Sequence, residues 1–173
     1  MNMNDGSGDL LPRCAWARGG DALYTAYHDR EWGTPSFQDR HLFEMLILEG
    51  FQAGLSWRTI LNKRDAFREA FDGFDPERVA RYGEDKRAEL MQNPGIVRNR
   101  LKIRSAVRNA QAFLSIQKEH GSFSNYLWGW VDSTPVLPGP GPVPTKTPLS
   151  DAISRDLMRR GMRFVGSVII YSF

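Results

Sequence analysis

The segment from His41 to Trp57 constrains this chain most, because a helical pattern of apolar residues there includes a carboxylate. Residues that recur at spacings of three, four and seven share one face of a helix. In this segment they are Leu42, Met45, Leu46, Glu49, Ala53 and Trp57. An ionised carboxylate on a buried face costs several kcal/mol unless a partner compensates its charge. The helix alone leaves two interpretations open. Glu49 is satisfied inside the protein, by backbone donors or a buried arginine, or it points into a cavity and binds a ligand.

The rest of the chain predicts further helices and therefore an all-α protein. Hydrophobic periodicity, capping residues and helix-breaking Pro and Gly set the boundaries. The predicted helices cover residues 39–55, 57–69, 76–81, 84–92, 96–120, 122–131 and 151–160. Asp75 is the expected N-cap before Pro76, and Ser150 is the expected cap of the helix from residue 151. Residues 135–148 are too rich in proline for a regular element and predict a loop. The β-branched residues between 164 and 173 would suit a strand by propensity.

The composition rules out several classes of protein but does not by itself identify a function. The 173 residues suffice for one domain or two small lobes around a core. The 23 Lys and Arg against 20 Asp and Glu permit nucleic-acid binding without arguing for it. No apolar run approaches the roughly 18 residues of a membrane helix, and we expect no secretory signal. A single cysteine, Cys14, excludes an intrachain disulfide, so we expect a cytoplasmic protein. Residues 1–10 are polar and Gly-rich and predict a disordered tail.

A tight turn at residues 93–98, between two predicted helices, carries the argument for nucleic-acid binding. Backbone N–H groups at the start of the second helix attract a phosphate through free donors and the helix dipole. Arg100, Arg104 and Arg108 recur every four residues along that helix. Such a row suits a DNA backbone, although a charge row alone more often marks a solvated helix face. The candidate DNA-binding residues are Gly95, Ile96, Val97, Arg98, Arg100, Lys102 and Arg104.

Five segments, in order along the chain, carry a resemblance to a known family. They read YTAYHDREWG at 24–33, LEGFQAGLSW at 48–57, GIVRNRLKI at 95–103, RGMRFVG at 160–166 and YSF at 171–173. Together they resemble the bacterial 3-methyladenine DNA glycosylase I family, a branch of the helix-hairpin-helix glycosylases, from Cys14 to Phe173. The resemblance implies a helix-hairpin-helix DNA glycosylase fold with two small helical lobes and the base pocket between them. It also implies that residues 164–173 begin a final helix. We expect one glycosylase domain over 11–173, divided into a helix-hairpin-helix lobe (41–121) and a terminal lobe (11–40 with 122–173).

The same resemblance implies the residues of the base pocket. Glu49 and Tyr27 would be the catalytic pair, and the base-binding aromatic residues would be Trp16, Tyr24, Trp32 and Trp57. Without the resemblance, aromatic residues at such spacing would more often be core. The implied activity is base-excision repair: hydrolysis of the N-glycosidic bond of 3-methyladenine in alkylated double-stranded DNA, with free 3-methyladenine as product. We expect no lysine beside Glu49, which predicts a monofunctional glycosylase, and we expect a monomer without membrane contact.

The metal site is where the resemblance is incomplete. Cys14 and His28 match two ligands of the structural zinc that joins the termini in this family. The other two ligands would follow Phe173, so we interpret the chain as C-terminally truncated, with little or no tightly bound zinc. The truncation is expected to expose Val168, Ile169, Ile170 and Phe173. The alternative function is a catalytically impaired DNA-binding remnant that lacks the zinc clip. A more remote alternative is a hydrolase of another small cationic substrate.

Overall fold

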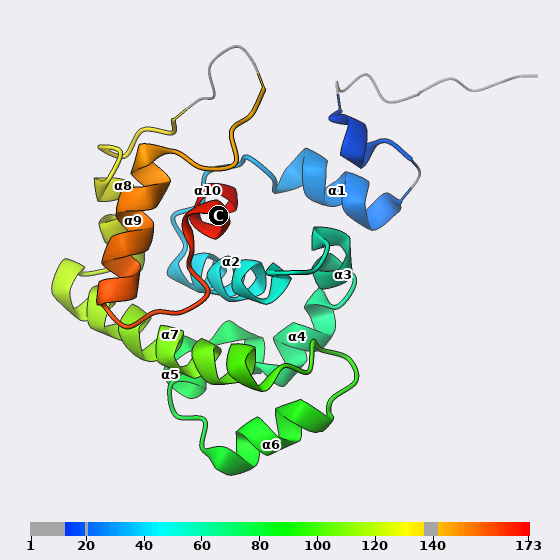
Figure 1. Ribbon diagram of the computed structural model, residues 1–173, viewed down its shortest axis with the longest axis vertical. Helices are drawn as coiled ribbons and strands as arrows, with labels where there is room; N and C mark the ends of the chain where they lie inside the picture. Colours follow the sequence, from blue (N-terminus) through cyan, green and yellow to red (C-terminus); the bar gives the residue numbers. More distant parts are fainter. Residues whose placement is uncertain (1–12, 20, 137–141) are drawn as a thin grey trace, which may run out of the picture. The chain divides into compact units, whose positions relative to one another are not determined.

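The computed structural model describes residues 13–19, 21–136 and 142–173. Every regular element within these ranges is helical (Figure 1). The elements are η1 (Ala15–Ala17), α1 (Ala22–Arg30), α2 (Asp39–Gln52), α3 (Trp57–Leu61), α4 (Arg64–Ala70), η2 (Asp72–Phe74), α5 (Pro76–Val79), α6 (Glu84–Gln92), α7 (Arg100–His120), α8 (Phe123–Gly129), α9 (Pro148–Arg159) and α10 (Ser167–Ser172), where η denotes a 3-10 helix. The all-α fold expected from the sequence is confirmed.

The chain divides into two compact units, residues 1–34 and 35–173. The first unit holds η1 and α1, and the second holds α2 to α10. The finer division into a helix-hairpin-helix lobe and a terminal lobe stays a prediction. The predicted tail at residues 1–10 lies outside the described residues. None of the described helices is long and apolar enough to cross a membrane.

Helix α2 lies inside the second unit and is buried on nearly all sides. It packs against α3, α7, α8 and α10, and in Figure 1 it lies between α7 and α10. Phe43 and Phe51 of α2 are no more than 2% exposed. Edge-on ring contacts join them to Phe113 of α7 and Phe67 of α4. A helix that is apolar almost all round is stable only when it is covered in this way.

Helix α7 is amphipathic, and it begins later than the sequence predicts. Its apolar side packs into the core through residues that include Ile103, Ala106, Ala110 and Phe113. The predicted start at Ile96 was wrong, because Asn99 is the N-cap and its side chain accepts hydrogen bonds from the backbone N–H groups of Leu101 and Lys102. Ile96 precedes the helix and is itself a core residue, 2% exposed.

Other boundaries differ where capping decides them. The predicted helix over 57–69 is interrupted and forms two helices, α3 and α4. Helix α9 begins at Pro148, because Thr147 is the N-cap and Ser150 completes a capping box with it instead of capping the helix itself. The predicted bounds of α6 are confirmed, as is Asp75 as the N-cap of α5.

The last segment forms helix α10, as the resemblance implied. Val168 is 52% exposed, but Ile170 is 7% exposed and lies in the core, and Phe173 packs against that core. The expectation that the whole apolar end is exposed was therefore wrong for Ile170 and Phe173, because α10 packs against α2 and α9. Within the predicted proline-rich loop, residues 137–141 lie outside the described ranges, and its last proline, Pro148, is the first residue of α9.

Candidate active site

Glu49 lies in the last turn of α2, which ends at Gln52 rather than at the predicted residue 55. It is 5% exposed. No hydrogen bond or ion pair reaches its carboxylate from the part of the chain that the structure describes. Burial raises the pKa of Glu49 to about 7. The buried group is therefore balanced between acid and anion near neutral pH, and a cationic ligand would favour the anion.

Glu44 lies earlier on the same helix, and its carboxylate is bound by arginines. The sequence left this kind of structural role open for Glu49. Glu44 is 8% exposed. The Nε atoms of Arg64 and Arg68 each lie 2.7 Å from its Oε1. Burial disfavours the ionised form of Glu44, but the hydrogen bonds from the two arginines outweigh it and lower the pKa. The structural explanation thus fits Glu44 and leaves Glu49 as the candidate for ligand binding.

A short turn connects Glu49 to Trp57. Gly54 in this turn has a φ of +79°, a conformation that glycine adopts without strain. Ser56 caps α3 by accepting a hydrogen bond of 3.1 Å from the backbone N–H of Thr59. Trp57 is the first residue of α3 and is partly buried against the core. The end of α2 and the start of α3 therefore carry two of the predicted pocket residues within one compact unit.

In the first unit, three predicted base-binding residues form an aromatic cluster. The ring centroid of Trp16 lies 5.0 Å from that of Tyr24 and 5.3 Å from that of Trp32. His28 stacks on Trp32 at 5.4 Å, a contact that the sequence did not predict. Tyr27 is a buried residue of α1. Its predicted catalytic partner belongs to the other unit, so the arrangement of these side chains around one base stays a prediction.

The turn between α6 and α7 is the predicted hairpin. Gly95 is needed there for close packing, because a Cβ at this position would lie 2.9 Å from the Cβ of Ala66 in α4. The Asn93 side chain accepts a hydrogen bond of 2.8 Å from the Gly95 N–H. Lys63 Nζ donates to the carbonyls of Pro94 (3.0 Å) and Gly95 (3.3 Å). Packing and a lysine clamp thus hold the hairpin turn against α4.

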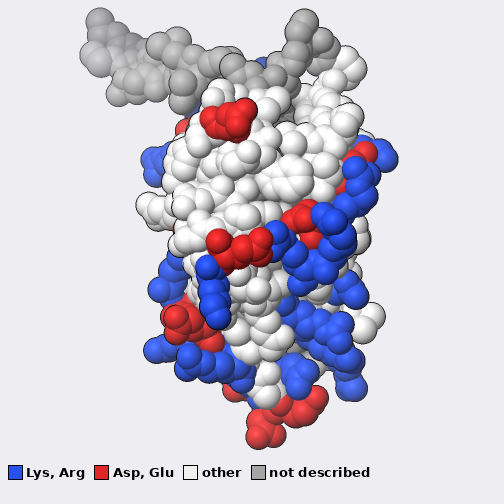
Figure 2. Space-filling view, turned by 90° about the vertical axis from the view of Figure 1, so that its left-hand side faces the viewer, with Lys and Arg blue, Asp and Glu red and all other residues white. Residues whose placement is uncertain are grey.

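Four arginines in this turn and along α7 face solvent, and no acidic partner pairs with them in the described residues. They are Arg98, Arg100, Arg104 and Arg108. By contrast, Arg81, just after α5, and Arg87 in α6 form ion pairs with Glu77 and Glu84. The face shown in Figure 2 likewise mixes Lys and Arg with Asp and Glu. Exposed guanidinium groups without carboxylate partners are available to phosphates.

The other members of the predicted DNA-binding set lie deeper. Ile96 is 2% exposed and Val97 packs against the core, so both shape the turn from inside. The predicted place of Lys102 alongside the arginines was wrong, because it is 7% exposed and points into the protein. In the first turn of α7, the N–H groups of Leu101 and Lys102 are not open to a phosphate, since the Asn99 side chain caps them. Free donors lie one step earlier: the backbone N–H groups of Val97 and Arg98 have no hydrogen-bond partner in the described residues.

The sequence matches the family model of methyladenine glycosylase over residues 16–173. It is 43% identical to the DNA-3-methyladenine glycosylase of Haemophilus influenzae, over 95% of this chain and 90% of that protein. The chain belongs to the methyladenine glycosylase family. It is also 43% identical to DNA-3-methyladenine glycosylase 1 of Escherichia coli, over 94% of this chain and 88% of that protein. A crystal structure of a 3-methyladenine DNA glycosylase I superposes with a TM-score of 0.88 at 46% identity, over 93% of this chain and 90% of that one.

The comparisons correct one part of the resemblance. They confirm the family and the fold, but they do not support the inferred C-terminal truncation, since the matches cover 90% and 88% of the two relatives. The alternative of an impaired remnant, which depended on that truncation, stays a prediction.

The two predicted zinc positions of this family member are close together but do not form a metal site. The backbone N–H of Cys14 donates to His28 Nε2 at 3.3 Å, and His28 Nδ1 lies 2.9 Å from Asp29 Oδ1. Both ring nitrogens of His28 therefore already have protein partners. No group of three or more potential metal ligands occurs among the described residues. These residues do not fit the structural zinc that the resemblance implied.

Sequence reasoning missed the role of Lys102. It belongs to α7, but its side chain reaches the end of α2, the helix that carries Glu49. Its Nζ donates to the carbonyls of Phe51 (2.8 Å) and Ala53 (2.6 Å). The Lys102 ammonium is engaged with these backbone carbonyls and is not free as a nucleophile. The expectation that no candidate lysine lies beside Glu49 stays a prediction. The place of Lys102 in a regular row of cations concealed its role in the sequence, since burial of a single lysine cannot be read from spacing.

Proposed function

We propose that this protein is a monofunctional DNA-3-methyladenine glycosylase, which hydrolyses the N-glycosidic bond of 3-methyladenine in alkylated double-stranded DNA and releases the free base. The observation that carries the proposal is Glu49, a buried carboxylate that has no hydrogen-bond or ion-pair partner among the described residues and whose pKa is raised to about 7. Family membership supplies the reaction class, because both named relatives are DNA-3-methyladenine glycosylases.

The chemistry of the substrate explains why such a carboxylate is useful. Adenine methylated at N3 is cationic in DNA and leaves the sugar as a neutral base, so no strong general acid is needed. The pocket must bind a cation and exclude neutral adenine. A fixed anion in a water-poor site stabilises a cation far better than it would in water. Glu49 takes this role in our proposal, while aromatic side chains stack on the faces of the flipped base.

Two solved relatives support the pairing of Glu49 with Tyr27. One, at 37% identity, carries a tyrosine-to-phenylalanine substitution and is described in complex with 3-methyladenine. Another, from Staphylococcus aureus, carries a glutamate-to-glutamine substitution. The numbers of the two substituted positions differ by the same amount as those of Tyr27 and Glu49. We therefore propose that Tyr27 and Glu49 face the same base, with Trp16, Tyr24, Trp32 and Trp57 as the aromatic walls.

The DNA duplex is proposed to bind along the hairpin and the start of α7. Backbone N–H groups of Val97 and Arg98 would donate to one phosphate, while Arg98, Arg100 and Arg104 would neutralise its neighbours. Such contacts position the duplex without reading its sequence. Specificity for the damaged base then belongs to the pocket. This separation predicts that undamaged duplex binds through the same arginines.

The remaining expectations of the sequence stay proposals. We propose a monomer in the cytoplasm with little or no tightly bound zinc, since His28 is already engaged by Cys14 and Asp29. Metal analysis of the dialysed protein tests the last point, and one equivalent of retained zinc would overturn it.

The decisive experiment is release of free methylated base from alkylated duplex DNA by this protein and by Glu49→Gln. We expect release of 3-methyladenine by the parent and almost none by the variant. A folded parent that binds DNA but releases no base would refute the proposed function. Equal release by the two proteins would refute the proposed role of Glu49 but not the proposed function.

A further inference from the structure

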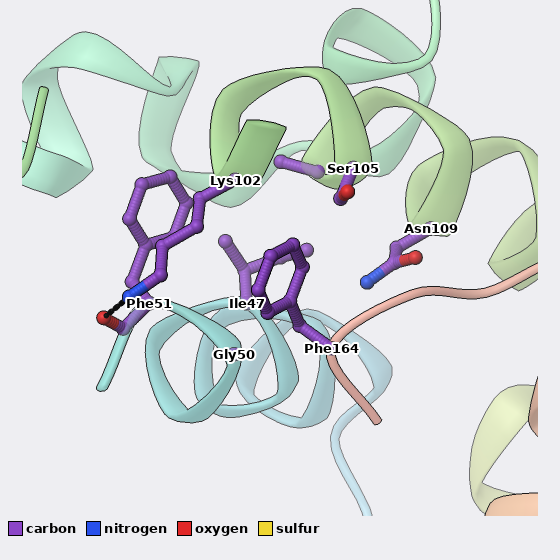
Figure 3. A pocket seen from close by; sticks show the side chains of 8 residues that line it. Ile47, Gly50, Phe51, Lys102, Ser105, Asn109 and Phe164 are labelled. Atoms are coloured by element: carbon purple, nitrogen blue, oxygen red, sulfur yellow. Dashed lines mark hydrogen bonds between the residues drawn. The ribbon is translucent and has the colours of Figure 1, made fainter. Parts of the chain in front are cut away.

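Lys102 joins the helix that follows the hairpin to the end of the helix that carries Glu49. It belongs to the first turns of α7, yet it is 7% exposed. Figure 3 shows its side chain reaching from α7 to the end of α2, where Nζ meets the Phe51 carbonyl. The same ammonium donates to the Ala53 carbonyl at 2.6 Å. Burying an ammonium group is costly, so a lysine in this place requires an explanation.

The carbonyls that Lys102 binds are those that a helix end leaves without partners. The last carbonyls of a helix accept no intrahelical hydrogen bond, and its C-terminal end carries partial negative charge. Ala53 is the C-cap of α2 and has φ −47° and ψ 116°, outside the helical region. An ammonium bound to carbonyls on both sides of this change in direction fixes the point at which α2 ends. That point determines how Glu49 and Trp57 lie relative to each other.

A second set of contacts fixes the same region from the other side. The ring of Phe164, from the segment between α9 and α10, lies between α2 and α7 in Figure 3, with Lys102 Nζ 5.9 Å from its centroid. Phe164 has a φ of +54°, which is unfavourable for a residue with a side chain. Asn109 compensates by bonding both the N–H and the carbonyl of Arg163, at 2.8 and 2.9 Å. A Cβ at Gly50 would lie 3.4 Å from the Cβ and the carbonyl oxygen of Phe164, so the two backbones approach closely here.

The small hollow beneath these residues is not the base pocket. It is lined by residues of α2 and α7 together with Phe164, and its volume is about 10 Å³. That is room for about one water molecule. Lys102 therefore serves the packing of helix ends and does not contact a base from this hollow.

We propose that Lys102 is a positioning residue for base excision, which holds the C-terminal end of α2 and the turn into α3 so that Glu49 and Trp57 keep the geometry that binds the base. This inference rests on the proposed function. A misplacement of about 1 Å in a reacting geometry costs roughly 100-fold in rate, so two backbone hydrogen bonds at this point suffice for a large effect. The opposing explanation is that Lys102 only stabilises the fold.

Lys63 provides a matched control, because it also donates to two backbone carbonyls but at the hairpin turn, those of Pro94 and Gly95. Lys102→Met and Lys63→Met each remove an ammonium clamp and retain an apolar chain. Tryptophan fluorescence measures the affinity for free 3-methyladenine. The other quantities are the affinity for undamaged duplex DNA, kcat and KM on alkylated duplex, and the thermal midpoint of unfolding.

For Lys102→Met we expect affinity for free 3-methyladenine to fall about tenfold and kcat to fall about 100-fold, while KM and duplex affinity stay within about twofold. For Lys63→Met we expect the reverse, with weaker duplex affinity and unchanged affinity for the free base. A folded Lys102→Met protein with parental base affinity and kcat would overturn the inference. So would an equal loss of base affinity in Lys63→Met at a similar thermal midpoint.

Two provisions keep the test decisive. If Lys102→Met does not fold, Lys102→Gln, which keeps a donor but loses charge and reach, is measured in its place and must show the same selective loss of base affinity. The parent protein separates the two hypotheses. Failure of the parent to bind or release 3-methyladenine counts against the proposed function, whereas an active parent with an equally active Lys102 variant counts against this inference only.

Discussion

Two buried glutamates on α2 show how one helix carries both a structural and a ligand-binding carboxylate. Glu44 is 8% exposed and accepts hydrogen bonds from Arg64 and Arg68, whereas Glu49 is 5% exposed and accepts none from the described residues. Residue type, helix and burial are alike, so the arginines of α4 make the difference. They lower the pKa of Glu44, while burial alone raises that of Glu49. A buried carboxylate left without a partner weakens a fold, and proteins keep such groups at functional sites.

The largest effect is expected on catalysis from Glu49→Gln. The substitution keeps the shape of the side chain and removes the charge that stabilises a cationic base. We expect kcat/KM on alkylated duplex to fall about 1,000-fold, or roughly 4 kcal/mol, the order seen when one preorganised electrostatic group is lost. Glu44→Gln, assayed at a temperature where it is folded, should retain activity within about tenfold. Similar losses in both variants would abolish the distinction between the two carboxylates.

The second effect concerns stability, and here the larger loss is expected from the substitution of Glu44. Glu44→Gln removes a carboxylate that pairs with Arg64, which is itself 7% exposed. Removing one partner of a buried ion pair costs about 3–5 kcal/mol, because the other charge is left uncompensated. We expect a loss of about 4 kcal/mol in the free energy of unfolding, measured by urea denaturation at pH 7. A loss below about 1 kcal/mol would mean that other groups or water compensate Arg64 and that the pair with Glu44 is not a structural necessity.

The third prediction follows from the raised pKa of Glu49. Below pH 4.5 the group is protonated in the folded and unfolded states alike. Between that value and about pH 7, Glu49 is ionised in the unfolded chain but stays protonated in the folded protein. Its contribution to the free energy of unfolding therefore falls as pH rises. Above pH 7 it levels off, at a cost of about 3 kcal/mol. Glu49→Gln lacks this cost, so its stability relative to the parent should grow by about that amount from pH 4.5 to pH 8.

Urea unfolding of both proteins across this pH range measures the difference and cancels the contributions of other titrating groups. A difference that does not depend on pH would show that Glu49 ionises normally and is solvated in the folded protein. The contrast with Glu44 would then be one of packing and not of charge.

The comparison of the two glutamates also shows what the sequence could and could not predict. Periodicity placed Glu49 on a buried stripe, because that inference needs only neighbours on the same helix. It could not assign Arg64 to Glu44, since this pair depends on how α4 packs against α2. Lys102 was assigned to a surface row for the same reason: its partners are carbonyls of a distant segment. The start of α7 was misplaced because Ile96 continues an apolar pattern although Asn99 caps the helix.

The smallest effects are expected at the hairpin, where the contrast is between unpaired and paired arginines. Arg100 and Arg104 have no acidic partner in the described residues, whereas Arg87 lies 2.8 Å from Glu84. Substituting Arg100 or Arg104 with Ala should weaken binding to undamaged duplex by about 1 kcal/mol each and lower the slope of log affinity against log salt by about 1. Arg87→Ala is the control and should leave both quantities unchanged, since its charge is already compensated.

Fluorescence titrations of a labelled duplex at several salt concentrations provide both quantities. If Arg87→Ala changed the slope as much as Arg100→Ala, the positive charge would act as a general field and not as a set of phosphate contacts. The hairpin would then lose its claim to position the duplex. If only the α7 arginines change the slope while base affinity is retained, DNA positioning and base recognition are separable. In that case duplex binding depends on surface arginines that have no acidic partner in the described residues, and base binding depends on Glu49, whose carboxylate has no partner there either.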